Sequence, residues 1–147
     1  PEATAETLRD GWFATGDLGA LLAGELYVTG RTKDVLILRG SNLMPDDLER
    51  LADGVTGGGG LMRSAAFSVA RGAEGEEAVL VVEVTETDPE RLAAVERDIR
   101  VRIGRTLGLP LADVRFVRRG RIPRTTSGKM QRQEVRRRYL EGTLDEL

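Results

Sequence analysis

Two lysines, Lys33 and Lys129, stand out in this sequence because all of its other basic residues are arginine. The chain has 147 residues and 22 basic side chains, of which 20 are arginine. A GC-rich genome explains a general preference for arginine. It does not explain why lysine is kept at two positions, since the compact lysine ammonium and the planar arginine fork are not interchangeable at a tight site. Both lysines are therefore candidate functional residues.

The chain contains no histidine and no cysteine, which excludes several kinds of chemistry. A Ser-His-Asp triad, a thiolate nucleophile, a disulfide and the commonest zinc sites are all impossible. The segment around Lys129 is not a phosphate-binding P-loop either. Met130 stands where that motif needs Ser or Thr, and Pro123 stands where it needs its first glycine.

The elements that must position these residues follow from the hydrophobic pattern and the capping residues. We predict helices from Pro45, from Pro89 after an Asp88 cap, and over residues 130–140. The predicted strands are residues 24–29, 35–39, 64–70, 78–82 and 114–117. This order predicts an α+β fold: a small domain with a mostly antiparallel three-stranded sheet, flanking helices and an N-terminal two-stranded hairpin.

Charge is distributed unevenly along the chain. Residues 115–147 carry 10 basic and 4 acidic side chains, whereas residues 1–114 carry 12 basic and 20 acidic ones. Phe116 and Tyr139 are the only aromatic residues in the basic segment, so the alternation of basic and aromatic residues that is typical of nucleic-acid binding is missing. No apolar run approaches the roughly 20 residues of a membrane span, and there is no signal peptide pattern. We expect a cytoplasmic protein with no nucleic-acid partner and no membrane span.

Four segments, in this order, resemble the closing motifs of the adenylate-forming superfamily, which includes acyl-CoA synthetases, peptide-synthetase adenylation domains and luciferases. They are TGDLG at 15–19, GRTKD at 30–34, RGSN at 39–42 with PDDLE at 45–49, and PRTTSGK at 123–129. Each is a weak signal alone. Together, in this order and at these separations, they are specific, and the resemblance covers nearly the whole chain.

Within this superfamily the chain is most similar to the fatty acyl-AMP ligases. The similarity lies in GELYVTGRTKD at 24–34, RGSNLMPDDLE at 39–49 and YLEGTL at 139–144. The resemblance implies the small C-terminal domain of such a ligase. Residues 1–32 would be the tail of the large N-terminal adenylation domain with the approach to the hinge, and residues 33–147 the small mobile domain.

The resemblance assigns roles to three residues in the first part of the chain. Asp17 matches the family aspartate that accepts hydrogen bonds from the ribose hydroxyls of ATP or AMP, as one carboxylate can do for two hydroxyls. Arg31 matches an arginine that contacts the ribose or a phosphate. Lys33 matches the hinge about which the small domain swings. Without the resemblance, Asp17 would be a turn residue, Arg31 a solvated surface arginine and Lys33 an ordinary connector.

Lys129 is the candidate catalytic residue. In the family, the matching lysine lies on a flexible loop and contacts the substrate carboxylate and the α-phosphate of ATP. The carboxylate attacks that phosphate as pyrophosphate leaves, and an ammonium stabilises the charge that builds on the phosphoryl oxygens. Gly40 is expected to line the face that is presented when a phosphopantetheine thiol attacks the acyl-adenylate. Without the resemblance, Lys129 would be a solvated loop lysine and Gly40 a turn at a strand end.

The resemblance also implies cofactors and partners. ATP and Mg²⁺ would bind mainly to the N-terminal adenylation domain, and phosphopantetheine would be carried by the partner. That partner would be an acidic acyl carrier protein docked on the basic C-terminal face, in lipid metabolism or in polyketide or lipopeptide biosynthesis. We expect the chain alone to be inactive, because it contains no acid pocket.

Two alternatives stay open at this point. An acyl-CoA synthetase would share every motif and use coenzyme A as the acceptor. A non-catalytic module that binds carrier protein or nucleotide would keep the fold without the activity. The motifs do not define the acyl chain length.

Overall fold

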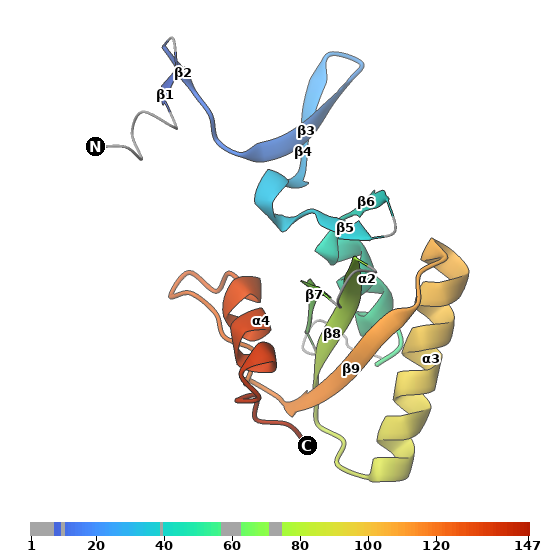
Figure 1. Cartoon of the computed structure of the whole chain (residues 1–147). Coiled ribbons are helices and arrows are strands. Elements are labelled where there is room, and N and C mark those ends of the chain that lie inside the picture. The colour runs from blue at the N-terminus through green and yellow to red at the C-terminus, as the bar shows by residue number, and fades with distance from the viewer. Residues whose placement is uncertain (1–7, 10, 39, 57–62, 71–74) are drawn as a thin grey trace. The chain divides into compact units, whose positions relative to one another are not determined.

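The chain separates into two compact units, Pro1–Val35 and Leu36–Leu147, in the computed structural model (Figure 1). The structure describes residues 8–9, 11–38, 40–56, 63–70 and 75–147. The division falls three residues beyond the boundary that the motifs predict. The assignment of the two parts to a large and a small domain stays a prediction.

The first unit consists of antiparallel hairpins followed by a short helix. Strands β1 (Leu8–Arg9) and β2 (Trp12–Phe13) form one pair, and β3 (Asp17–Leu22) and β4 (Glu25–Arg31) form the other. Ala23 and Gly24 connect β3 to β4 with φ angles of 51° and 84°. Positive φ at both positions is what a type I′ two-residue hairpin turn requires. The 3₁₀ helix η1 (Thr32–Asp34) follows β4 directly.

The second unit opens with a small hairpin and a helix. Strands β5 (Leu36–Leu38) and β6 (Ser41–Leu43) pair antiparallel, and helix α2 (Pro45–Asp53) follows. Proline starts α2 as predicted, because the first helical position needs no N–H donor and proline fixes a helical φ. Leu48 and Ala52, one turn apart, are fully buried.

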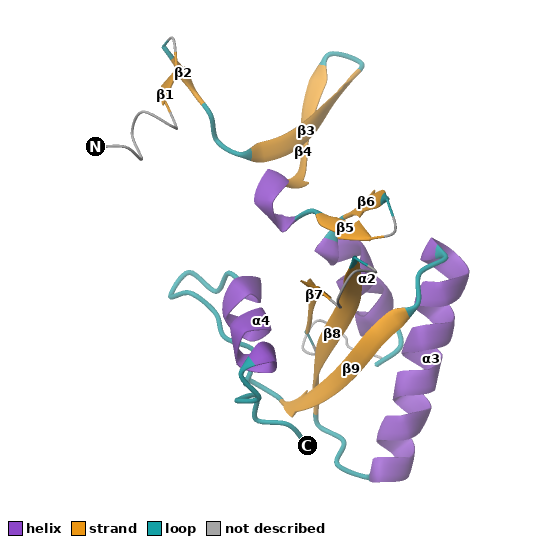
Figure 2. Cartoon of the chain, in the orientation of Figure 1, coloured by secondary structure: helices purple, strands orange, loops and turns teal. Residues whose placement is uncertain are grey.

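The main sheet has the strand order β7-β8-β9, with β7 (Ser64–Ala70), β8 (Glu76–Val84) and β9 (Leu111–Arg118) (Figure 2). The β7–β8 pairing is antiparallel and the β8–β9 pairing is parallel. Helix α3 (Pro89–Leu107) makes the crossover that a parallel pair needs. The α+β class is confirmed, and the parallel pairing is a feature that the prediction did not include.

Both faces of this sheet are covered. On one face, α2, α3 and β5 pack on alternate residues of β8 such as Leu80 and Val82. On the other face, α4 (Arg132–Leu140) packs through Val135 on Val79 and Val81. Period-two alternation along β8 therefore separates two cores. In the part of the chain that the structure describes, no helix is both long and apolar enough to cross a membrane.

The last residues of the chain lie beside β9. Glu146 forms a bridge with Val117, and the Leu147 N–H donates to the Phe116 carbonyl at 3.0 Å. Two ion pairs fix the same segment, Arg115 to Glu146 at 3.2 Å and Arg121 to Asp145 at 2.9 Å. Residues 145–147 thus cover part of the open edge of β9.

Candidate nucleotide and catalytic sites

Asp17 and Arg31 are brought together by the β3–β4 hairpin. They are directly opposite in its register, and Arg31 Nε lies 3.1 Å from Asp17 Oδ1. The Asp17 side chain is 36% exposed and that of Arg31 is 50% exposed, so both remain accessible. The Thr32 N–H donates to the Gly16 carbonyl at 2.9 Å and closes the end of the hairpin. An arginine-oriented, accessible carboxylate of this kind can accept hydrogen bonds from two hydroxyl groups.

Lys33 lies in the middle of η1, and its side chain is exposed. The backbone is extended on both sides of this short helix, at Arg31 with φ −124° and at Val35 with φ −61° and ψ 128°. Val35 is also the last residue of the first unit. A single helical turn between extended residues at a unit boundary is compatible with the predicted hinge, which stays a prediction.

Lys129 lies on a loop that its own hydrogen bonds close. We call residues 122–131 the Lys129 loop. The Thr125 N–H donates to the Lys129 carbonyl at 2.8 Å, and the Lys129 N–H donates to Thr125 Oγ1 at 3.0 Å. Thr125 Oγ1 also lies 2.9 Å from Ser127 Oγ, and Gly128 has φ +80°, which favours glycine. Hydrogen bonds therefore hold the backbone of Lys129 in place, while its side chain is exposed.

Both ends of the Lys129 loop are attached to buried carboxylates. The Ile122 N–H donates to Glu83 Oε1 at 2.8 Å, and Glu83 is only 3% exposed. At the other end, Arg132 donates to Glu49 through Nε at 2.6 Å and Nη2 at 2.7 Å, and Glu49 is 7% exposed. The hydrogen bonds to Glu49 raise the pKa of Arg132 above its usual range despite burial.

Sequence reasoning did not identify Glu49 or Glu83 as part of a site. Glu83 did carry a signal, because it is an acidic residue inside the otherwise apolar β8 run of 78–84. Glu49 belongs to the PDDLE segment, but nothing there indicated that its side chain is buried, since an acidic residue in the first two turns of a helix has an ordinary explanation in the helix dipole.

Gly40 lies between β5 and β6 with φ +79° and is exposed. A Cβ at this position would meet no atom within 4 Å, so the backbone angle alone favours glycine here. Gly40 and Lys129 belong to the second unit, while Asp17 and Arg31 belong to the first. A place for Gly40 on an acceptor-binding face stays a prediction.

The basic helix α4 carries less free charge than its composition indicates. Arg137 pairs with Glu134 at 2.8 Å and with Glu141 at 2.6 Å, and Arg138 pairs with Glu134 at 2.8 Å. Hydrogen bonds from Arg137 and Arg138 lower the pKa of Glu134 to about 2. The basic face predicted for carrier docking is thus partly neutralised by acidic side chains of the same helix and its end.

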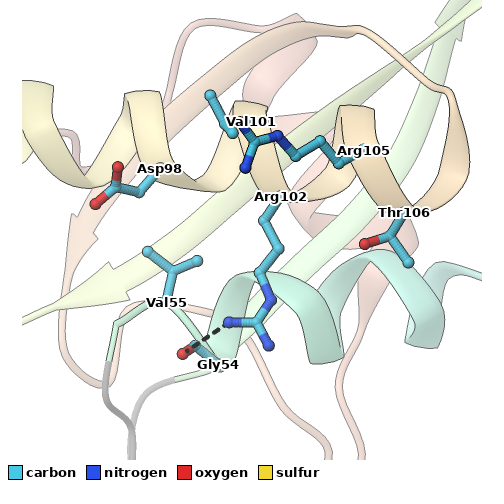
Figure 3. Close-up of a pocket in the computed structure, with 7 residues that line it drawn as sticks. All are labelled: Gly54, Val55, Asp98, Val101, Arg102, Arg105 and Thr106. Carbon is cyan, nitrogen blue, oxygen red and sulfur yellow. Dashed lines mark hydrogen bonds between the residues drawn. The ribbon is translucent and has the colours of Figure 1, made fainter.

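A shallow cavity of about 500 Å³ lies between the end of α2 and helix α3, away from the Lys129 loop (Figure 3). Arg102 crosses it and donates to the Gly54 carbonyl at 3.3 Å. Its lining includes none of the predicted site residues. Among the described residues, no group of three or more acidic side chains is placed to hold a metal ion.

Comparison with known proteins gives the class of protein. No family model matches the chain. The chain is 42% identical over 134 residues to a 4-hydroxyphenylalkanoate adenylyltransferase of Mycobacterium marinum, covering 87% of this chain and 21% of that protein. It is 37% identical over 145 residues to a medium-chain-fatty-acid–[acyl-carrier-protein] ligase of Moorena producens, covering 97% of this chain and 24% of the relative.

Solved structures agree with these relatives. McyG A-PCP complexed with phenylalanyl-adenylate superposes with a TM-score of 0.81 at 30% identity, over 96% of this chain and 22% of that one. A structure from the fatty acyl-adenylate ligases of E. coli and L. pneumophila gives 0.73 at 35% identity, over 96% and 24%.

The chain therefore belongs to the adenylate-forming ligases. It corresponds to their C-terminal domain, and fatty acyl-AMP ligases are among its relatives. It spans only about a fifth to a quarter of the length of the relatives it matches.

Proposed function

We propose that this chain works as the C-terminal domain of an ATP-dependent acid–AMP ligase. The ligase would activate a fatty acid as an acyl-adenylate and support transfer of the acyl group to the phosphopantetheine thiol of an acyl carrier protein. The observation that carries this proposal is the exposed Lys129, held on a hydrogen-bonded loop in a chain whose relatives are adenylate-forming ligases.

In the first half-reaction, a carboxylate oxygen attacks the α-phosphorus of ATP and pyrophosphate leaves. Negative charge rises on the phosphoryl oxygens, and the Lys129 ammonium stabilises it. Asp17 accepts hydrogen bonds from the ribose hydroxyls, and Arg31 orients that carboxylate from 3.1 Å. Mg²⁺ would neutralise phosphate charge when bound, with ligands supplied outside this chain.

In the second half-reaction, the pantetheine thiol attacks the acyl-adenylate and AMP leaves. A rotation of the small domain about Lys33 would move the Lys129 loop out of the active site and present the face that carries Gly40 there instead. The partner is an acidic carrier protein that docks on residues 115–147. Several α4 arginines, and also Arg115 and Arg121, are already in ion pairs, so the docking charge comes from Arg118, Arg119 and Arg124.

The test uses the complete ligase. Exchange of pyrophosphate into ATP that depends on a fatty acid measures the first half-reaction, and acyl transfer to a carrier protein or to coenzyme A measures the second. We expect exchange, and transfer to the carrier protein in preference to coenzyme A. The absence of acid-dependent exchange would refute the proposal.

Coenzyme A is the acceptor in a second candidate function. A protein of Caulobacter vibrioides named as an acyl-CoA synthetase is 37% identical over 147 residues, which favours this alternative. Preferential transfer to coenzyme A in the same assay would establish it and would leave the adenylation chemistry unchanged.

A further inference from the structure

Two carboxylates are buried in the described part of the chain, and both are attached to the Lys129 loop. Glu83 binds its first residue and Glu49 binds Arg132, which follows its last. We propose that Glu49 and Glu83 are positioning residues that hold Lys129 in place for adenylation. The proposal deepens the proposed function and rests on it for the role of Lys129.

Glu83 fixes the start of the loop to the central strand of the sheet. It lies on β8, which pairs with β7 on one side and β9 on the other. Burial of a carboxylate is costly unless it is hydrogen-bonded, and alternation along β8 places Glu83 on the same face as the buried Val79 and Val81. The Ile122 N–H, 2.8 Å from Oε1, gives Glu83 a charge-assisted hydrogen bond.

Glu49 fixes the end of the loop to two further elements. Its side chain on α2 accepts two hydrogen bonds from the Arg132 guanidinium and one from the Ala66 N–H of β7, at 2.9 Å. Asp46, one turn earlier on α2, adds a contact to Arg132 Nη2 at 2.9 Å. A two-point arginine–carboxylate pair fixes orientation as well as distance.

Lys129 lies only three residues before Arg132, so little chain separates it from this anchor. Between the two anchors the loop closes on itself through Thr125, whose backbone and hydroxyl both bind the Lys129 backbone. Lys129 is thereby attached to the sheet and to α2 through short connections. Such precision matters because a misplacement of ~1 Å can reduce a rate by about 100-fold.

Hydrogen exchange on the 147-residue chain tests the anchoring without ATP or any acid. In Glu83→Met the Ile122 N–H loses its acceptor, and the hydrogen bond from the Lys129 N–H to Thr125 Oγ1 should open more often, so both amides should exchange at least about tenfold faster. Glu83→Gln keeps an acceptor and should restore slow exchange. Glu134→Gln removes two surface ion pairs of α4 and should leave these amides unchanged. Unchanged exchange in Glu83→Met would overturn the proposal.

The other anchor is tested with a neutral pair. Glu49→Gln combined with Arg132→Met leaves no buried charge unpaired and keeps an acceptor for Ala66, so the fold should be retained. In the complete ligase, this double variant should lower kcat for pyrophosphate exchange by about 10- to 100-fold with KM for ATP within about twofold. A kcat within about twofold of wild type, in a variant of normal thermal stability, would show that the pair is only structural.

The two measurements separate this inference from the proposed function. If the wild-type ligase shows no adenylation, the proposed function fails, while hydrogen exchange still shows whether the carboxylates order the loop.

Discussion

Replacement of Lys129 by alanine should separate catalysis from stability more cleanly than any other change in this chain. The side chain is exposed, and the two hydrogen bonds of its backbone survive in Lys129→Ala. The free energy of unfolding should therefore change by less than about 0.5 kcal/mol. Loss of one group that stabilises a transition state typically costs ~2.7–4 kcal/mol, which is about 100- to 1,000-fold in kcat.

The assay measures both half-reactions of the complete ligase with the same variant. Pyrophosphate exchange should fall by that factor, while thioester formation from added acyl-adenylate should stay close to wild type, because the ammonium acts on the first transition state. Lys129→Arg is the matched control for charge. It should recover only part of the rate, since a planar fork replaces a point charge. Equal damage to both half-reactions, or a lowered unfolding temperature, would refute a catalytic role.

Three further predictions concern other residues. Lys33→Pro should slow acyl transfer more than pyrophosphate exchange, because proline fixes φ and traps one arrangement; two rates near wild type would place the pivot elsewhere. Asp17→Ala should raise KM for ATP about tenfold, measured by the same exchange, through loss of a charged hydrogen-bond acceptor. Tyr139→Phe removes the 2.8 Å hydrogen bond to Asp113 Oδ2 and should cost about 1 kcal/mol in urea unfolding at pH 7. Burial raises the pKa of Asp113, but hydrogen bonds from Tyr139 and Arg115 outweigh it, so the pKa is lowered. The difference in stability between wild type and Tyr139→Phe should therefore shrink as the pH falls below 3.8 and Asp113 protonates.

Helix positions were the most predictable part of the fold. Pro45 begins α2, the Asp88 side chain accepts hydrogen bonds at the start of α3, and Gly108 ends α3 with φ 66°. Caps of this kind act within one turn, so the local sequence contains the whole signal.

Strand pairing was less predictable. Strand β3 is missing from the predicted strands, because Asp17 and Gly19 favour turns and the strand is held mainly by its partner β4. The helix between residues 84 and 111 did indicate that β9 pairs parallel to β8, since the two strands of a strand–helix–strand unit run parallel. The prediction of a mostly antiparallel sheet did not use it.

The candidate site divides in the same way. Asp17, Arg31 and Lys129 are predicted from local motifs, and the structure adds the Asp17–Arg31 ion pair. The contact of Glu49 with Arg132 spans 83 positions of the sequence, and the contact of Glu83 with Ile122 spans 39. No local pattern encodes which buried acid meets which loop, so these contacts required the folded chain.

The final residues of the chain have a consequence for self-association. An exposed edge strand offers unpaired N–H and C=O groups on which another molecule can add a strand. Here the Leu147 N–H donates a hydrogen bond to the Phe116 carbonyl, and Glu146 lies against Val117 on the edge of β9. Residues 145–147 thus act as a short protective segment, which the ion pair between Glu146 and Arg115 holds at the edge. Removal of these residues would open a template for edge-to-edge aggregation while leaving both hydrophobic cores intact.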